Sequence, residues 1–292
     1  MYALIPFCDN FDLLEFGYFG SMSTKRIFSV LLFLMVTISA CTQVPITGRK
    51  QFKLLPNSTL NAMASTQYRE FLRTHRLSND AVQSDMVKRV GTKIQRAVTN
   101  YFRVKKQLKY IAGYNWEFNL VDDPTVNAWC MPGGKVVVYT GLLPVSLNED
   151  GLAVVMGHEI AHAIANHGNE RMSQGLAAQA GGLALSVALS SRPAETQNLF
   201  LQAYGVGTQL GALLPFSRLH ESEADELGLI FMAMAGYNPE EAIPFWQRMD
   251  RASSGAEPLE FLSTHPAHGT RINKLKAVIP KAKEYAKNYP LK

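Results

Sequence analysis

The sequence predicts an α+β protein in which helices dominate and a small sheet precedes a central helix. Apolar residues recur at helical spacing along most of the 292-residue chain. Two short stretches, residues 116–121 and 136–139, instead alternate or are rich in β-branched residues, as strands are. With 47% hydrophobic and 18% charged residues, the composition is that of a globular protein and excludes a wholly disordered chain.

The helices follow in order from periodicity and capping signals. Residues 58–76 and 81–99 have helical spacing of apolar positions. Asn148 is the predicted N-cap of the central helix, which has an acidic first turn and runs through about His167. Further helices are predicted at 195–214, at 217–235, from Pro239 onward and at 269–287.

Residues 172–191 carry no charge and are rich in Gly, Ala and Leu. We expect a tightly packed helix whose small residues allow close approach, and the alternative is a segment that dips into a membrane. Two adjacent glycines and two glutamines in this stretch weigh against a stable lipid-exposed helix.

The N-terminal residues 1–40 are predicted to be absent from the working protein. From Met22 the chain has a short basic stretch, an apolar run at 27–38 and small residues before Cys41, which is the layout of a secretory signal. The apolar run is shorter than the roughly 20 residues of a transmembrane helix. The acidic residues before Met22 do not suit a signal, so that part is interpreted as a spurious extension. The alternative is an uncleaved N-terminal anchor.

The residues at Cys41 resemble the lipobox of bacterial lipoproteins, which implies that this cysteine carries lipid. Thr42 follows it, and the sorting rule of many Gram-negative bacteria then implies an outer-membrane protein that faces the periplasm. The polar residues 41–57 are predicted to be a tether between the lipid and a folded domain at 58–292. The net charge of +5 is a mild excess and does not indicate nucleic-acid binding.

The stretch His158-Glu159-Ile160-Ala161-His162 predicts a metal site on the central helix. Two histidines four positions apart lie on one helix face, so their ring nitrogens can bind one Zn²⁺ at about 2.0–2.1 Å. Glu159 is rotated by about 100° from His158 and can act as a general base beside the metal ion. The apolar surroundings indicate a buried helix, in which these polar side chains need a partner.

The third metal ligand is expected from a later helix. The metzincin pattern would place a histidine where this chain has Gly168. His167 lies about 140° around the helix from His162 and is not expected to join the same metal ion. Glu221 and Asp225 share a helix face, so we assign Glu221 as the ligand and Asp225 as a hydrogen-bond acceptor for a ligand histidine. On the same reasoning Glu223 points away.

The two parts of this pattern resemble the gluzincin peptidases that include HtpX-like proteases, prenyl-protein endopeptidases and mitochondrial Oma-type proteases. The segment around Asn127 and Ala128 and the segment Thr264-His265-Pro266 with Arg271 add to the resemblance, and residues 41–49 are similar to the start of the periplasmic lipoprotein branch. The resemblance implies a zincin-like metallopeptidase with one zinc ion per chain, acting on proteins of the cell envelope.

The resemblance also implies roles for single residues. A strand near 136–139, with Asn127 and Ala128, is expected to form the sheet edge that holds an extended substrate. Arg271 and His265 are candidate oxyanion donors, and His265 is also a candidate inhibitory ligand that closes zinc's open position. We expect an endopeptidase that cleaves misfolded or misassembled envelope proteins. The alternatives are a periplasmic chaperone or assembly factor for outer-membrane proteins with secondary proteolysis, and a small-molecule zinc hydrolase.

Overall fold

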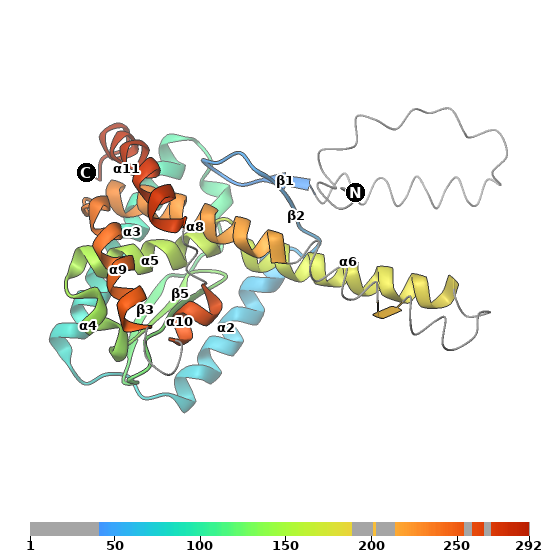
Figure 1. Ribbon diagram of the computed structural model, residues 1–292, viewed down its shortest axis with the longest axis horizontal. Coiled ribbons are helices and arrows are strands. Elements are labelled where there is room, and N and C mark those ends of the chain that lie inside the picture. The colour runs from blue at the N-terminus through green and yellow to red at the C-terminus, as the bar shows by residue number, and fades with distance from the viewer. Residues whose placement is uncertain (1–40, 189–200, 203–213, 254–258, 266–269, 292) are drawn as a thin grey trace. The chain divides into compact units, whose positions relative to one another are not determined.

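The computed structural model describes residues 41–188, 201–202, 214–253, 259–265 and 270–291 (Figure 1). The chain divides into two compact units, one built from residues 1–56 with 168–219 and one from 57–167 with 220–292. The predicted extension and signal at 1–40, and nearly all of the predicted helix at 195–214, lie outside the described residues. The predicted fold class, a helix-dominated α+β protein with a small sheet, is confirmed.

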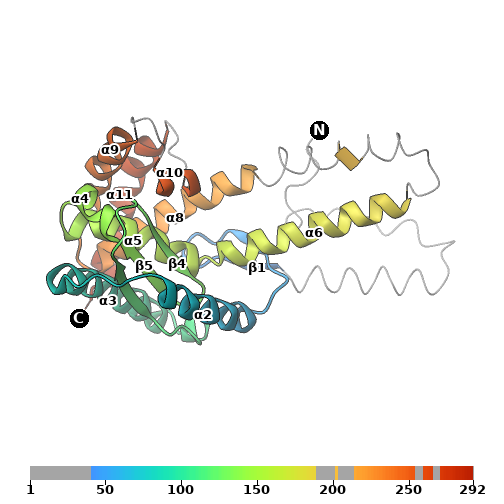
Figure 2. The same cartoon turned by 90° about the horizontal axis from the view of Figure 1, so that it is seen from below.

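The regular elements follow the predicted order in most places (Figures 1 and 2). The strands are β1 (Cys41–Gln43), β2 (Lys50–Phe52), β3 (Glu117–Val121), β4 (Ala128–Met131) and β5 (Lys135–Tyr139). The longer helices are α2 (Asn57–Thr74), α3 (Ala81–Val104), α5 (Glu149–Ile164), α6 (His167–Ala188), α8 (Leu214–Met234), α9 (Ala242–Ala252) and α11 (Arg271–Asn288). The short helical segments are η2 (Leu108–Ile111), η3 (Thr140–Leu142), α4 (Leu143–Ser146), η5 (Pro239–Glu241) and α10 (Glu260–Thr264).

The three-stranded sheet of the larger unit has the order β3-β5-β4. Strand β5 pairs in parallel with β3 and antiparallel with β4, so it is the central strand. The expectation that residues 136–139 form the substrate-holding edge is therefore wrong. Every residue of β5 is buried, which suits a central strand, and its continuous run of three valines was the signal for this. The edge strands are β3 and β4, and the sequence analysis did not predict β4 as a strand.

Helices cover both faces of this sheet. Tyr68 of α2 packs with Val121, Val137 and Tyr139 on one face, and α3 and α5 pack against β3 and β4. The resulting core surrounds α5, in which all residues from 151 to 161 are buried. This burial explains why the central helix shows little amphipathic pattern in the sequence.

Helices α5 and α8 cross where a glycine of each helix meets the other. A Cβ atom added to Gly157 would lie 2.8 Å from the carbonyl oxygen of Gly228. A Cβ atom added to Gly228 would lie 2.8 Å from the backbone nitrogen of His158. The two backbones thus touch directly, and the first turns of α8 beyond residue 220 come within side-chain reach of α5.

Helix α5 begins as predicted and ends three residues earlier than predicted. Asn148 caps its N-terminus by accepting from the Gly151 N–H. Its last carbonyl groups accept from tyrosine hydroxyls, with Tyr110 donating to Ile164. Asn166 then adopts a left-handed conformation with φ of 56°, and α6 starts at His167. Asparagine favours this conformation at helix ends, so the break is a property of this residue type.

In the smaller unit, β1 and β2 form an antiparallel hairpin. Arg49 pairs with the buried Glu170 at 2.7 Å, and the Leu54 N–H donates to Ser173. Part of the predicted polar tether at 41–57 thus forms a hairpin with contacts to α6, which the prediction did not include. Val44 is buried and indicates the same.

Helix α6 differs from the tightly packed helix that the sequence predicted. Leu176 and Leu183 are exposed. In the described part of the chain, no atom lies within 4 Å of a Cβ added to Gly175. Among the described helices, none is both long enough and apolar enough to span a membrane.

Candidate metal centre

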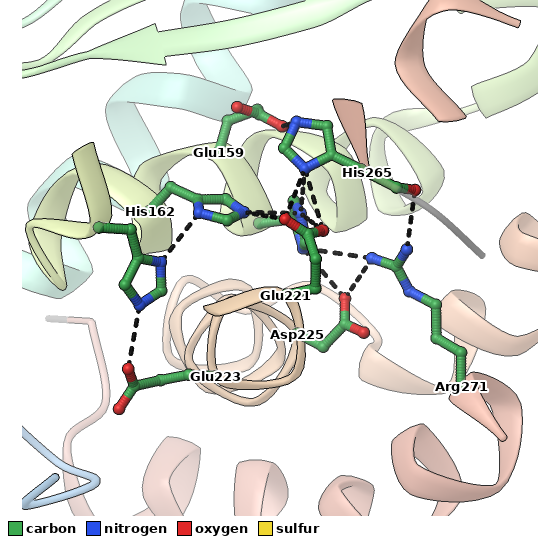
Figure 3. Close-up of polar contacts among 9 residues, drawn as sticks. Glu159, His162, Glu221, Glu223, Asp225, His265 and Arg271 are labelled. Atoms are coloured by element: carbon green, nitrogen blue, oxygen red, sulfur yellow. Dashed lines mark hydrogen bonds and ion pairs between the residues drawn. The ribbon is translucent and has the colours of Figure 1, made fainter. Parts of the chain in front are cut away.

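Helices α5 and α8 bring the three predicted metal ligands together. Nε2 of His158 and Nε2 of His162 lie 3.1 Å apart. The Glu221 carboxylate lies 3.3 Å from each of these nitrogens, through Oε2 and Oε1 respectively (Figure 3). The positions one helical turn apart on α5 and the close crossing of α8 produce this arrangement, as the spacing predicts.

These atoms fit a metal ion of the size and preference of zinc. A tetrahedral zinc site with bonds of about 2.0–2.2 Å places its ligand atoms roughly 3.3–3.6 Å from one another. The separations of 3.1 and 3.3 Å here are close to that range. Imidazole nitrogens together with a carboxylate oxygen are also a donor set that zinc favours.

His265 lies beside the same three side chains. Its Nδ1 is 3.2 Å from Nε2 of His158 and 3.0 Å from Oε2 of Glu221. One ligand atom from each of the four residues lies within 4.8 Å of the others. His265 follows α10, so the two histidines of α5, one residue of α8 and this segment all meet at one point.

Glu159 lies on the other side of His265. Its Oε1 atom is 3.3 Å from Nε2 of His265. This oxygen atom has no hydrogen-bond partner in the described structure. The side chain is buried, and the backbone N–H of Cys130 on β4 donates to its carboxylate. A buried carboxylate oxygen without a donor is suited to accept a proton from a reactant.

Asp225 contacts His158 at Nδ1, the ring nitrogen that does not face His162 and Glu221, and Arg271 contacts Asp225. Oδ1 of Asp225 accepts from Nδ1 of His158 at 3.0 Å, as predicted for the residue that orients a ligand histidine. Nη2 of Arg271 donates to the same oxygen at 2.6 Å, and the guanidinium lies 3.3 Å above the Trp246 ring. Arg271 therefore approaches the Nδ1 side of His158, away from Nε2. This placement favours holding Asp225 over the expected role as an oxyanion donor.

The charges of these groups shift their pKa values in directions that suit a metal site. Burial lowers the pKa of His158, but the hydrogen bonds and charges of Asp225 and Glu221 outweigh it and raise the pKa to about 9. Burial lowers the pKa of His162 to about 3, so this ring stays neutral. Burial alone would raise the pKa of Glu221, but the surrounding histidines donate to its carboxylate and lower the pKa below its usual range. The carboxylates that stabilise the protonated form of His158 would also stabilise a metal ion bound to its ring in place of that proton.

Burial also raises the pKa of Glu159, against the charges of His265 and His158. A raised pKa brings a carboxylate closer to the range in which it can accept and return a proton near neutral pH.

Two residues that the sequence analysis placed outside the site lie within it. His167 is fully buried and contacts His162, and Glu223, which was predicted to point away, contacts His167. The helix break at Asn166 redirects His167, so the helical angle used for its prediction does not apply. Asn166, one residue before the predicted end of the helix at His167, was the available signal.

Asn127 and Ala128 were predicted to lie at the sheet edge that holds a substrate, and the structure places them at the start of an edge strand. Ala128 begins the edge strand β4, and its N–H donates to the Asn127 side chain at 2.9 Å. The Asn127 amide also donates to Glu260 on α10 at 3.0 Å. Cys130, two residues after Ala128 on β4, contacts Glu159, so this strand lies beside the Glu159 carboxylate.

The sequence of this chain is similar to the sequences of known metallopeptidases. Residues 86–279 match the family described as Peptidase family M48. The chain is 35% identical over 249 residues to the mitochondrial metalloendopeptidase OMA1 of Schizosaccharomyces pombe, an alignment that covers 82% of this chain and 66% of that protein. For the Bos taurus metalloendopeptidase OMA1 the identity is 31% over 272 residues, covering 91% of this chain and 50% of the relative.

A bacterial relative is more distant. The chain is 29% identical over 161 residues to the beta-barrel assembly-enhancing protease of Escherichia coli, covering 54% of this chain and 33% of that protein. This chain thus spans between half and two thirds of the length of the two OMA1 proteins.

The family match covers most of the chain and all the residues gathered at the site, from His158 to His265. The resemblance inferred from the motifs is confirmed at the level of the family. The chain belongs to peptidase family M48.

Proposed function

We propose that this protein is a zinc-dependent endopeptidase. His158, His162 and Glu221 are the zinc ligands, and Glu159 is the general base. The observation that carries the proposal is the meeting of two imidazole nitrogens and one carboxylate at 3.1–3.3 Å, with a second, buried carboxylate beside them. A zinc ion bound there supplies Lewis acidity, which polarises a peptide carbonyl and lowers the pKa of water.

The side chains of this chain transfer the proton and orient the metal ligands. Glu159 accepts the proton of the attacking water and returns it to the leaving amine. Its burial, which raises its pKa, suits both transfers. Asp225 accepts from Nδ1 of His158 and so holds Nε2 toward the other ligands, and Arg271 fixes Asp225.

The side of β4 that faces away from β5 is the proposed substrate-binding edge. An extended peptide can add to a sheet edge through main-chain hydrogen bonds. Asn127 and Ala128 lie at the start of this edge, and Cys130 on the same strand contacts Glu159. A peptide bound along β4 would therefore pass the general base.

His265 supports a closed form of this active site. Its ring lies between the metal ligands and Glu159, with one nitrogen facing each. Substrate and water must enter this same space. We therefore assign His265 as an inhibitory fourth ligand that must leave before catalysis.

The cell envelope is the proposed place of action. The predicted signal and lipidation of Cys41 would anchor the protein to the outer membrane, on the periplasmic side. The name of the E. coli relative connects a similar protease with β-barrel assembly, which supports misfolded or misassembled envelope proteins as substrates. The names of the OMA1 relatives indicate a mitochondrial setting for those proteins.

Casein cleavage by the purified protein tests the proposal, with and without a chelator and with Glu159→Gln beside the wild type. We expect chelation to abolish cleavage. We expect Glu159→Gln to keep its zinc and to lose at least about a hundredfold in rate, because the base is gone. Unchanged cleavage by a zinc-loaded Glu159→Gln variant would contradict the mechanism. If that variant still supports outer-membrane protein assembly in cells, the assembly-factor alternative is favoured.

A further inference from the structure

A buried line of side chains leads away from the metal centre behind His162. Nδ1 of His162 lies 2.9 Å from Nδ1 of His167, and Nε2 of His167 lies 3.0 Å from Oε2 of Glu223 (Figure 3). His167 is fully buried and Glu223 nearly so. Neither residue has a part in the peptidase mechanism described above.

The two ends of this line determine where its protons lie. If Nε2 of His162 binds a metal ion, the remaining ring proton is on Nδ1, which then donates to Nδ1 of His167. His167 accepts at Nδ1 and so carries its own proton on Nε2. That N–H donates to the Glu223 carboxylate, which only accepts. Each contact thus has one donor and one acceptor, and both tautomers are fixed.

We propose that His167 and Glu223 are positioning residues that hold His162 in the tautomer and orientation that bind the metal ion. This inference rests on the proposed function, because it requires His162 to be a ligand. The carboxylate also increases the electron density at Nε2 of His162 through the intervening ring, as direct carboxylate partners of ligand histidines do.

The backbone positions explain why the His167 ring lies between His162 and the Glu223 carboxylate. Glu221 and Glu223 are two positions apart on α8 and therefore point about 200° apart. With Glu221 at the metal centre, Glu223 faces another direction and needs an intermediate group to reach His162. The turn at Asn166 brings His167 into that place. His220 stacks on the His167 ring at 4.4 Å between centroids and 14° between planes, which fixes the plane of that ring.

The two ligand histidines are consequently held in different ways. His158 donates directly to Asp225, whose charge is shared with Arg271 at 2.6 Å. His162 is connected with its carboxylate only through His167. Loss of Glu223 should therefore act on the metal ion through one histidine and leave the other histidine's partner in place.

Zinc affinity, measured by competition with a chromophoric chelator, tests this assignment. We expect Glu223→Leu and His167→Phe each to weaken zinc binding by about 10- to 100-fold. Glu223→Gln keeps an acceptor of the same shape and should weaken binding less. Because the pair acts as a unit, the double variant should lose no more than the larger single loss.

Glu170→Gln is the matched control. Glu170 is also a buried carboxylate, but it pairs with Arg49 and, like Arg49, belongs to the smaller unit. We expect this variant to bind zinc like the wild type. Zinc affinity that is equal in the wild type and Glu223→Leu would overturn the inference, as would an equal loss in Glu170→Gln. Absence of zinc binding by the wild type would instead contradict the proposed function itself.

A second readout needs only the wild-type chain, so it does not depend on how the variants fold. Nitrogen-15 NMR of the seven histidines reports which ring nitrogen carries the proton. We expect His167 to be protonated on Nε2 and bare on Nδ1 in the zinc-loaded protein. A proton on Nδ1 of His167 would overturn the inference, since His162 could not then donate to it.

Discussion

At the scale of single residues, His265 lies in the space that a substrate and a water molecule would enter under the proposed mechanism. Its two ring nitrogens face Glu221 and Glu159. We expect His265→Ala to raise casein cleavage several-fold, because molecules held in the closed form become competent. The size of the rise measures how large the closed fraction was.

The control for this prediction is His75→Ala, which removes an exposed histidine at the end of α2. It should leave cleavage unchanged. If His265→Ala keeps its zinc but shows equal or lower activity than the wild type, His265 does not close the site.

Single residues also show where sequence reasoning succeeded. The spacing of His158 and His162 and the shared face of Glu221 and Asp225 follow from helix geometry alone, so they could be predicted. The role of His167 could not be predicted in the same way, because it depends on a left-handed turn at Asn166 that ends the helix early.

At the scale of elements, the crossing of α5 and α8 decides whether the proposed metal ligands meet. Gly228→Ala should lower the free energy of unfolding by about 1–3 kcal/mol, since the new methyl group would meet the backbone of α5. This loss outweighs the gain of about 1 kcal/mol that alanine brings to a helix. Zinc content should fall as well, because α8 carries Glu221.

Gly175→Ala is the matched control on α6. Its added Cβ meets no described atom within 4 Å, so the helix gain of up to about 1 kcal/mol should remain. Denaturant unfolding measures both variants. A Gly228→Ala variant with wild-type stability and full zinc content would show that the close crossing is dispensable.

The contacts of Glu149 in the first turn of α5 stabilise the fold in a pH-dependent way. Glu149 accepts from Arg89 at 2.8 Å and from Tyr237 at 3.2 Å. Burial raises the pKa of Glu149, but these contacts outweigh it and lower the pKa below its ordinary value of 4.5. The folded-state pKa is the lower one, so the stabilisation is present above pH 4.5 and is lost as the pH falls through the folded-state value.

Glu149→Gln should therefore lower the Tm at pH 7 by about 1–4 °C, a small effect because the pair with Arg89 is partly exposed. The difference from the wild type should shrink as the pH is lowered from 5 to 3. Glu70→Gln, which removes an exposed partner of Arg73, should change little at any pH. A Tm difference for Glu149→Gln that is constant across this range would contradict the assignment.

The elements also show the limit of prediction by pattern. Helices with clear caps or periodicity, such as α3 and α5, were expected close to their observed starts. Strand β4 was missed, and β5 was mistaken for an edge, because strand order depends on pairings that lie outside each strand's own residues. The sequence analysis placed Asn127 and Ala128 at the sheet edge but not the strand that follows them, so the contact of Glu159 with Cys130 on β4 could be found only from the structure.

At the scale of the whole molecule, the chain has a larger unit, which contains the proposed metal ligands, and a smaller unit, which contains Cys41. The smaller unit contains a hairpin and most of α6 in its described part. Lipid on Cys41 would attach this smaller unit to the membrane, while the metal centre belongs to the larger unit. If the proposed lipidation of Cys41 holds, membrane attachment and peptide hydrolysis belong to different units of one chain.

The most direct test of the account is anomalous diffraction from crystals of the protein at the zinc absorption edge. We predict one anomalous peak per chain, about 2.0–2.2 Å from Nε2 of His158, Nε2 of His162 and a carboxylate oxygen of Glu221. No peak at these three side chains, or a peak held by other residues, would contradict the central claim.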